Sequence, residues 1–162
     1  MKLTLYTDYS LRMLMYLAAD PDQTSTIQEI ADRFNISKNH LMKVAYELGR
    51  AGYVETVRGR NGGLRLARAA PEIRLGDLVR ECEGDFTLVE CFDAEHNQCV
   101  LTSACHLKYV LKEALDAYFQ SLNRYTLADL LQKKATLVKL LSLNVGHSDK
   151  SVPPKGPRAS SR

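Results

Sequence analysis

Three cysteines with the spacing Cys-x7-Cys-x5-Cys are the residues of this 162-residue chain best suited to carry chemistry. They are Cys91, Cys99 and Cys105, on an irregular stretch that leads into a helix. Three thiolates on a loop can wrap an inorganic cluster, and soft sulfur ligands suit iron. Cys105 also gains from the positive end of the helix dipole, which favours a thiolate. The spacing therefore favours an iron-sulfur cluster, of either the [4Fe-4S] or the [2Fe-2S] type.

Two other uses of the thiols stay open on spacing alone. Structural zinc usually takes paired ligands two to four residues apart, and no such cysteine pair occurs here. A disulfide is disfavoured because the chain shows no secretory signal pattern and is expected to be cytoplasmic, where thiols stay reduced. Cys82 falls at an inward helical position and is expected in the core. The fourth ligand of a cluster is left open between a residue brought in from elsewhere and the nearby candidates Asp93, Glu95, His96 and His106.

The elements that position this loop begin with two helices near the N-terminus. Thr7 is expected to cap the first helix, which has Asp8 in its first turn and ends before Pro21. A short second helix is indicated by two capping-box patterns, Ser25 with Gln28 and Thr26 with Glu29.

A third helix between Ser37 and Gly52 completes a helix-turn-helix pattern. Ser37 is expected to cap it, and an apolar stripe faces inward: Leu41, Val44, Ala45 and Leu48. The polar residues near its start can reach base edges and phosphates in a major groove. These candidate DNA-binding residues are Ser37, Lys38, Asn39, His40 and Lys43.

A hairpin is predicted next, from residues 53–57 and 64–66, with Arg58, Arg60 and Asn61 at its glycine-rich tip. The segment from Ser37 to Arg68 carries seven basic residues against two acidic ones, whereas the whole chain has a net charge of only +3. Nucleotide binding is disfavoured because the P-loop pattern is absent. The hairpin instead suits a wing whose arginines and Asn61 enter a narrow minor groove of double-stranded DNA.

The predicted fold is mainly α with a small β-hairpin wing, a winged helix-turn-helix followed by a long dimerisation helix. A short helix ends at Gly84, a wide apolar stripe over residues 104–123 suggests packing against a second copy, and a last helix is expected over residues 126–143. The domains are then residues 1–84 for DNA binding, 85–106 for the cluster, 107–145 for dimerisation and 146–162 as a disordered tail.

Composition excludes several function classes. With 45% apolar and 25% charged residues, the chain is typical of a globular protein. No stretch approaches the roughly 18 apolar residues of a membrane span, so no membrane partner is expected. The sequence shows no CxxC motif and no arrangement of nucleophile and base, so an enzyme that uses the thiols for redox or metal catalysis is disfavoured.

The assembled motifs resemble the bacterial winged-helix repressors that bind iron-sulfur clusters. The resemblance runs from Met1 to about Leu131 and is carried by LTLYTDYSLRMLMYLA, ISKNHLMKVAYELGRAGYVETVRGRNGGLRLA, IRLGDLVRECEG, the cysteine loop and NRYTLADLL. Details such as TDY at residues 7–9 and LVEC before the first ligand are most similar to the nitric-oxide-sensing members of this group.

The resemblance implies a homodimer that represses nitric-oxide detoxification genes while its cluster is intact and releases its operator when nitric oxide attacks the cluster. It also implies a fourth ligand from the first helix of the other subunit, at Asp8. The alternative is a regulator of cluster assembly or of iron and redox status. Such regulators have a histidine three residues after the last cysteine, and this position is Lys108 here. A further departure is the gap of seven residues between Cys91 and Cys99, where five are common.

Overall fold

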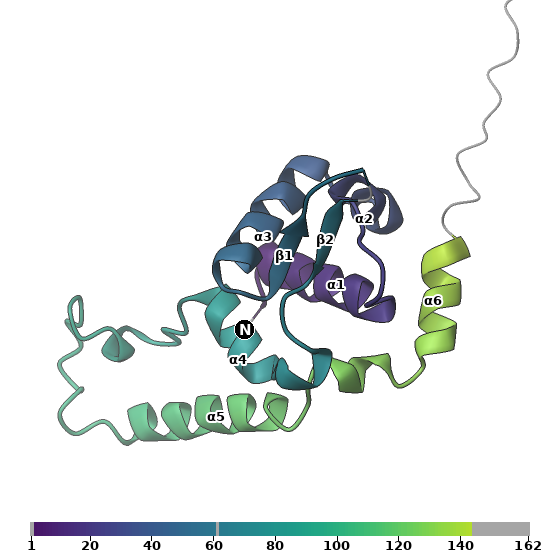
Figure 1. The fold of residues 1–162 in the computed structure, drawn as a ribbon. Helices are drawn as coiled ribbons and strands as arrows, with labels where there is room; N and C mark the ends of the chain where they lie inside the picture. The colour runs from purple at the N-terminus through teal and green to yellow at the C-terminus, as the bar shows by residue number, and fades with distance from the viewer. Residues whose placement is uncertain (1, 61, 144–162) are drawn as a thin grey trace, which may run out of the picture.

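A computed structural model describes residues 2–60 and 62–143 of the chain, and this part contains six α-helices and one two-stranded antiparallel sheet. Helices α1 to α4 and the hairpin form one body, while the segment after α4 swings out before returning as α5 (Figure 1). The mainly α fold with a β-hairpin wing is therefore confirmed. None of these described helices is long and apolar enough to cross a lipid bilayer.

Helix α1 (Leu5–Ala19) begins one turn earlier than predicted, because Thr4 and not Thr7 is its N-cap. The Thr4 Oγ1 atom accepts a hydrogen bond from the Thr7 backbone N–H at 3.2 Å. Thr7 itself is fully buried inside the helix. Thr4 is held in turn by Glu83, whose Oε1 accepts its backbone N–H at 2.8 Å. The start of α1 is thus set by a contact with α4, and Asp8 still lies in the first turn.

Helices α2 (Ile27–Phe34) and α3 (Lys38–Arg50) form the helix-turn-helix. The Thr26–Glu29 capping box is confirmed, whereas Ser25 instead pairs with Leu64 in a β-bridge and so belongs to the wing. Asn35 turns the chain between the helices with a positive φ of 51°. Ser37 is at the N-cap of α3, but its side chain makes no capping hydrogen bond, so that part of the prediction is wrong.

The predicted inward stripe of α3 is confirmed, since its four apolar residues are all buried. They pack with α1, α2 and the base of the wing in one hydrophobic core. The wing consists of β1 (Val54–Val57) and β2 (Gly63–Leu66) in antiparallel register, with Thr56 opposite Leu64. Gly63 lies so close to the α1–α2 connection that a Cβ there would meet the Ser25 carbonyl oxygen at 2.9 Å. The wing is therefore fixed against the helix-turn-helix.

A short 3-10 helix (Ala70–Glu72) leads into helix α4 (Leu75–Glu83), which ends at Gly84 as predicted. Helix α5 (His106–Leu122) packs its C-terminal part against α4. Asn123, at the end of α5, accepts the Asp77 backbone N–H at 3.0 Å and donates to the Asp77 carboxylate at 2.9 Å. This pair fixes the direction in which α5 leaves the winged-helix body.

The predicted single helix over residues 126–143 is wrong, because the structure divides it into a 3-10 turn (Ala128–Leu131) and helix α6 (Lys134–Leu143). Thr126 and Asp129 do contact each other, with the Thr126 N–H donating to Asp129 at 2.7 Å, but the N-cap of the turn is Leu127, so the predicted helix cap at Thr126 is wrong. Leu127, however, is fully buried and donates its N–H to the Ile73 carbonyl at 2.8 Å. Anchoring to a distant residue stops a regular helix here. The predicted tail, residues 146–162, lies outside the described residues.

Candidate functional site

The three predicted ligand cysteines lie along the segment that swings out between α4 and α5 (Figure 1). Cys91 is in a 3-10 turn (Glu90–Phe92), Cys99 follows in a loop, and Cys105 is the N-cap of α5. All three thiols are free and partly exposed. The N-cap position of Cys105 agrees with its expected place at a helix start.

Side-chain hydrogen bonds bring the two ends of the Cys91–Cys99 gap together. Glu90 accepts the backbone N–H of Gln98 through Oε1, so the residues beside the two cysteines are joined. On the other side, Asn97 accepts the Cys99 N–H at 3.1 Å and Thr102 donates to the Cys99 carbonyl at 2.8 Å. Cys99 is thereby held through its backbone, which leaves its thiol available.

A separate hydrogen-bonded turn, at residues 93–96, lies within the gap between Cys91 and Cys99. One Asp93 oxygen accepts the backbone N–H groups of Glu95 and His96, at 2.9 and 3.2 Å, and the other lies 2.8 Å from His96 Nδ1. These bonds, led by the one with His96, lower the pKa of Asp93. Two of the nearby candidates for a fourth ligand, Asp93 and His96, are therefore already paired with each other.

The described residues of one chain do not bring a set of metal ligands together in this structure. Among the described residues, no group of three or more Cys, His, Asp or Glu side chains is close enough to hold a metal ion. Asp8 lies on α1, where its carboxylate is partly exposed and pairs with Arg12 at 2.8 Å. The structure thus places the three cysteines on one loop, and Asp8 on a different element.

The fourth cysteine, Cys82, packs against the hydrophobic core from α4, as its helical phase predicts. Burial raises the pKa of its thiol. A thiol of this kind stays protonated and unreactive at neutral pH. Cys82 is therefore a structural residue.

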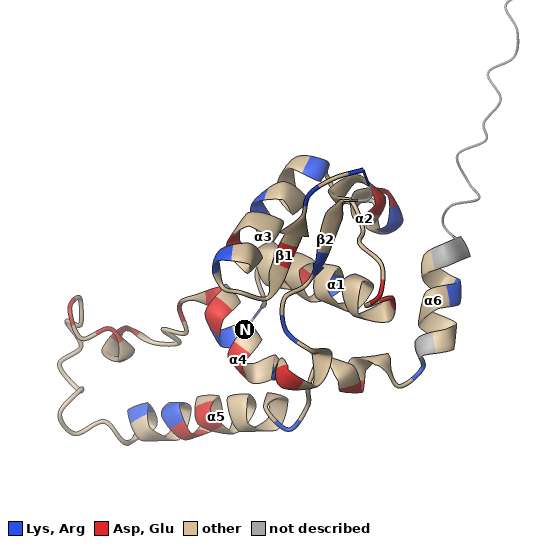
Figure 2. Cartoon of the chain, in the orientation of Figure 1, with Lys and Arg blue, Asp and Glu red and all other residues tan. Residues whose placement is uncertain are grey.

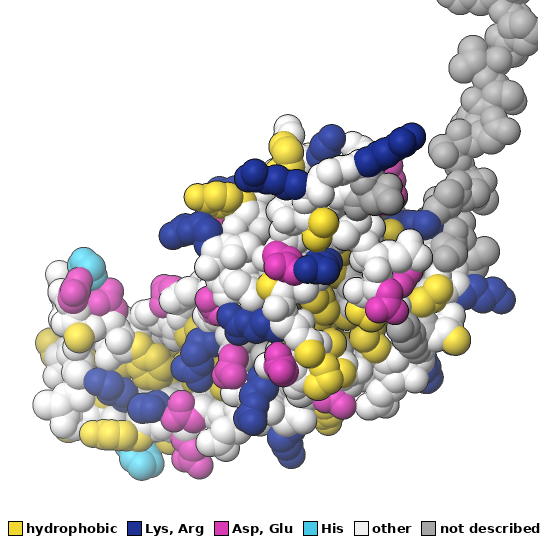
Figure 3. Space-filling view, in the orientation of Figure 1, with side chains coloured by type: hydrophobic (Ala, Val, Ile, Leu, Met, Phe, Trp, Pro, Cys, Tyr) yellow, Lys and Arg dark blue, Asp and Glu magenta, His cyan; other side chains and the backbone are white. Residues whose placement is uncertain are grey.

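The predicted DNA-binding face is basic and exposed. Lys and Arg residues lie along α3 and the hairpin (Figure 2), and their side chains project over both at the top of the space-filling view (Figure 3). Lys38, Asn39 and Lys43 are exposed on α3, as are Arg58 and Arg60 between the strands. Asn61 lies outside the described residues. The helix and the wing therefore present their cations on one side of the body.

Two exposed residues of this face were missed by the sequence analysis, and one predicted residue has another contact. Met42 and Tyr46 are 44% and 65% exposed on α3, and the Arg50 guanidinium lies 5.9 Å from the Tyr46 ring centre. Both residues lie outside the inward apolar stripe of α3, so the sequence pattern already indicated that they are exposed. His40 is exposed as well, and its ring also contacts Tyr9 of α1, with 6.4 Å between ring centres.

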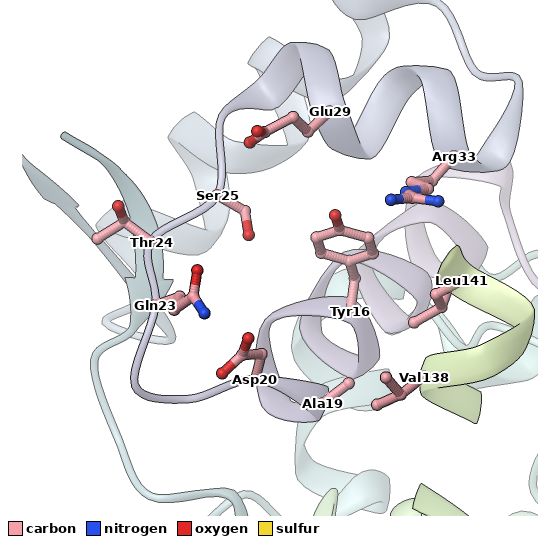
Figure 4. A pocket seen from close by; sticks show the side chains of 10 residues that line it. All are labelled: Tyr16, Ala19, Asp20, Gln23, Thr24, Ser25, Glu29, Arg33, Val138 and Leu141. Carbon is pink, nitrogen blue, oxygen red and sulfur yellow. The ribbon is translucent and has the colours of Figure 1, made fainter. Parts of the chain in front are cut away.

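A hollow of about 220 Å³ lies on the α6 side of the body, between α1, α2 and α6. Its walls carry Tyr16, Glu29, Arg33 and Leu141, with polar side chains of the α1–α2 connection (Figure 4). The ten lining residues include neither cysteine nor histidine. This hollow therefore lacks the soft ligands that the cysteine loop supplies.

Comparisons with known proteins match the chain to transcriptional regulators. A family model described as "Rrf2: Iron-dependent Transcriptional regulator" matches residues 3–133. The chain is 56% identical to the HTH-type transcriptional regulator NsrR of Bacillus subtilis, over 88% of this chain and 99% of that protein. It is 53% identical to NsrR of Geobacillus kaustophilus, over 87% and 97% of the two chains.

Solved structures show the same architecture. The global cysteine regulator CymR of B. subtilis matches with a TM-score of 0.67 and 28% identity, over 80% of this chain and 95% of CymR. IscR of T. potens matches with a TM-score of 0.66 and 27% identity, over 82% and 88%. The chain therefore belongs to the Rrf2 family of iron-dependent transcriptional regulators.

Proposed function

We propose that the protein is a transcriptional repressor that binds operator DNA as a homodimer while its three loop cysteines hold an iron-sulfur cluster, and that nitric oxide releases it. The single observation that carries this proposal is the presence, in one chain, of an exposed basic helix-turn-helix and a projecting loop with three free thiols. The similarity to regulators named NsrR supports nitric oxide as the signal.

The donor set fits an iron-sulfur cluster. Cys91, Cys99 and Cys105 are the proposed ligands, because their thiols are free and soft sulfur donors suit iron. The partner subunit's Asp8 is the proposed fourth ligand, since Asp8 lies on α1 with a partly exposed carboxylate. A carboxylate is a hard, exchangeable ligand, so this position would be the one most open to an incoming molecule. When bound, such a cluster supplies iron that reacts with nitric oxide.

Dimerisation is proposed through α5. Of its 17 residues, only Phe119 is buried, while Leu107, Tyr109 and Val110 are 59%, 67% and 47% exposed. Exposed apolar side chains also gather over the loop and α5 in Figure 3. Exposed apolar side chains gathered on one helix are typical of an interface between subunits.

We propose that residues 1–84 bind DNA, residues 85–106 hold the cluster and residues 107–145 form the dimer interface. Ser37, Lys38, Asn39, His40 and Lys43 would approach the major groove, and Arg58, Arg60 and Asn61 the minor groove, once per subunit on a palindromic site.

The test is an operator titration of protein purified without oxygen, before and after addition of a nitric-oxide donor. We expect the visible absorbance of the cluster to change and the operator affinity to fall at least tenfold in the same titration. Removal of free iron by a chelator, without nitric oxide, serves as the comparison. Unchanged affinity after complete reaction with nitric oxide would contradict the switch.

The wing gives a separate prediction. Replacing Arg60 with alanine removes one exposed cation from the hairpin tip, so the slope of log K against log salt concentration should fall by about 1. Titrations of one operator at several salt concentrations measure this slope. Lys139→Ala, on the exposed side of α6, is the matched control and should leave it unchanged. Equal slopes for Arg60→Ala and the control would mean that Arg60 makes no contact with the DNA phosphates.

A further inference from the structure

An open cavity of about 480 Å³ lies between the first half of α1 and the recognition helix α3. We call it the α1–α3 cavity. Its lining residues are Leu5, Tyr6 and Tyr9 of α1, His40, Lys43, Val44 and Glu47 of α3, and Glu81 of α4. Apolar side chains form much of its wall, with charged groups among them. A surface with this composition suits an apolar side chain from another molecule, surrounded by a polar rim.

The cavity adjoins Asp8, the residue proposed to reach the partner's cluster. Leu5 and Tyr9 line the cavity from positions three residues before and one residue after Asp8. On a helix, residues three apart have Cβ atoms about 5–6 Å from each other. A segment of another subunit that reaches the Asp8 carboxylate would therefore lie near Leu5, at the edge of this cavity.

The chain carries a matching apolar segment directly after a ligand cysteine. Val100 is 92% exposed and Leu101 is 64% exposed, although both are apolar. The segment that holds them swings away from α1–α4 of its own chain (Figure 1). Because adjacent Cα atoms are about 3.8 Å apart, Val100 must follow Cys99 wherever the thiol is bound.

We propose that Val100 and Leu101 of one subunit insert into the α1–α3 cavity of the other subunit when the cluster is bound. The inference rests on the proposed function, because a cluster shared by Cys99 and the partner subunit's Asp8 brings the segment and the cavity together. Insertion removes apolar surface from water on both sides.

The position of the cavity gives this contact a consequence for DNA binding. One wall is α1, beside Asp8, and the opposite wall is α3, including His40 and Lys43. The ring contact between Tyr9 and His40 already links these walls. A side chain seated between them would brace the recognition helix against α1. Loss of the cluster would withdraw that brace, which gives the loop a direct physical route to the helix that reads DNA.

The first test replaces Val100 with aspartate, which is tolerated in the free chain because the residue is exposed, yet unfavourable in an apolar cavity. We expect operator affinity of the cluster-loaded V100D protein to be at least tenfold weaker, with cluster absorbance retained. V100I should keep the affinity of the wild-type protein. Leu140→Asp, which alters an exposed leucine of α6, is the matched control and should also bind normally.

The second test locates the segment directly. A photoreactive phenylalanine analogue at position 100 is introduced into isotopically heavy chains, which are mixed with light wild-type chains to form mixed dimers. We expect cross-links from the heavy chain to residues 5–9 or 40–47 of the light chain, and their loss after nitric oxide treatment. Cross-links only within one chain, or only to α5, would overturn the inference.

The two proposals fail in different ways. Wild-type protein that takes up no cluster contradicts the proposed function, and this inference with it. Cluster-loaded wild-type protein that binds its operator, together with an unchanged V100D variant, contradicts the inference alone.

Discussion

The Cys99→Ala protein is expected to be colourless and to bind its operator about 10³-fold or more weakly than the wild-type protein, near the level of non-specific binding. The supports of Cys99 are backbone bonds, from its N–H to Asn97 and from Thr102 to its carbonyl, and alanine keeps both. The substitution therefore removes the sulfur atom without changing the hydrogen bonds that hold the loop. Absorbance spectra under anaerobic conditions and operator titrations measure the two effects.

The fourth cysteine provides the control for this experiment. Cys82→Ala removes a thiol that packs against the core, so we expect unchanged absorbance and operator affinity. Its free energy of unfolding should fall by about 1 kcal/mol, because a partly buried side chain is shortened. Full cluster absorbance in Cys99→Ala, or its loss in Cys82→Ala, would contradict the proposed ligand set.

Gly76→Ala is expected to lower the free energy of unfolding by about 1–3 kcal/mol, since it inserts a methyl group where α4 and α5 touch. A Cβ at this position would lie 2.8 Å from the Phe119 carbonyl oxygen and closer still to the Asn123 side chain. That side chain would have to give up its paired hydrogen bonds with Asp77. The α5 helix would shift as well, so we also expect weaker dimerisation. Urea unfolding and sedimentation measure the two changes.

Gly49→Ala is the matched control in another helix. Its Cβ would meet only the Val54 carbonyl oxygen, at an ordinary 3.8 Å. Alanine loses less backbone entropy than glycine in a helix, so this variant should be more stable by about 0.5–1 kcal/mol. If both glycine variants change stability in the same direction, close approach of α4 and α5 is not what requires glycine at position 76.

Local patterns predicted much of the winged helix, and tertiary contacts explain what they missed. The α3 stripe, the Thr26 cap and the end of α4 at Gly84 follow from periodicity and capping within a few residues. The start of α1 at Thr4 depends on Glu83, 79 residues away. The break before α6 depends in the same way on the contact of Leu127 with Ile73.

In the candidate site, too, some features were predictable from the sequence and others were not. The three cysteines were evident from residue type and spacing, whereas their supports, Glu90, Asn97 and Thr102, are polar loop residues with no distinctive pattern. Asp8 was proposed from family resemblance. The contact of the exposed His40 ring with Tyr9 was not predictable, because nothing in the sequence pattern links the start of the recognition helix to α1.

Because the hydrogen bonds of the cysteine loop stay within the loop, we expect cluster binding to depend on the concentration of the protein. The loop bonds described above join residues 90–102 to one another, and the ligand expected from α1 belongs to the other subunit. Binding of the inorganic group and association of the chains are then linked equilibria, each of which strengthens the other by mass action. Dilution should favour release of both together. Occupancy of the operator would consequently rise more steeply than in proportion to the number of molecules in the cell.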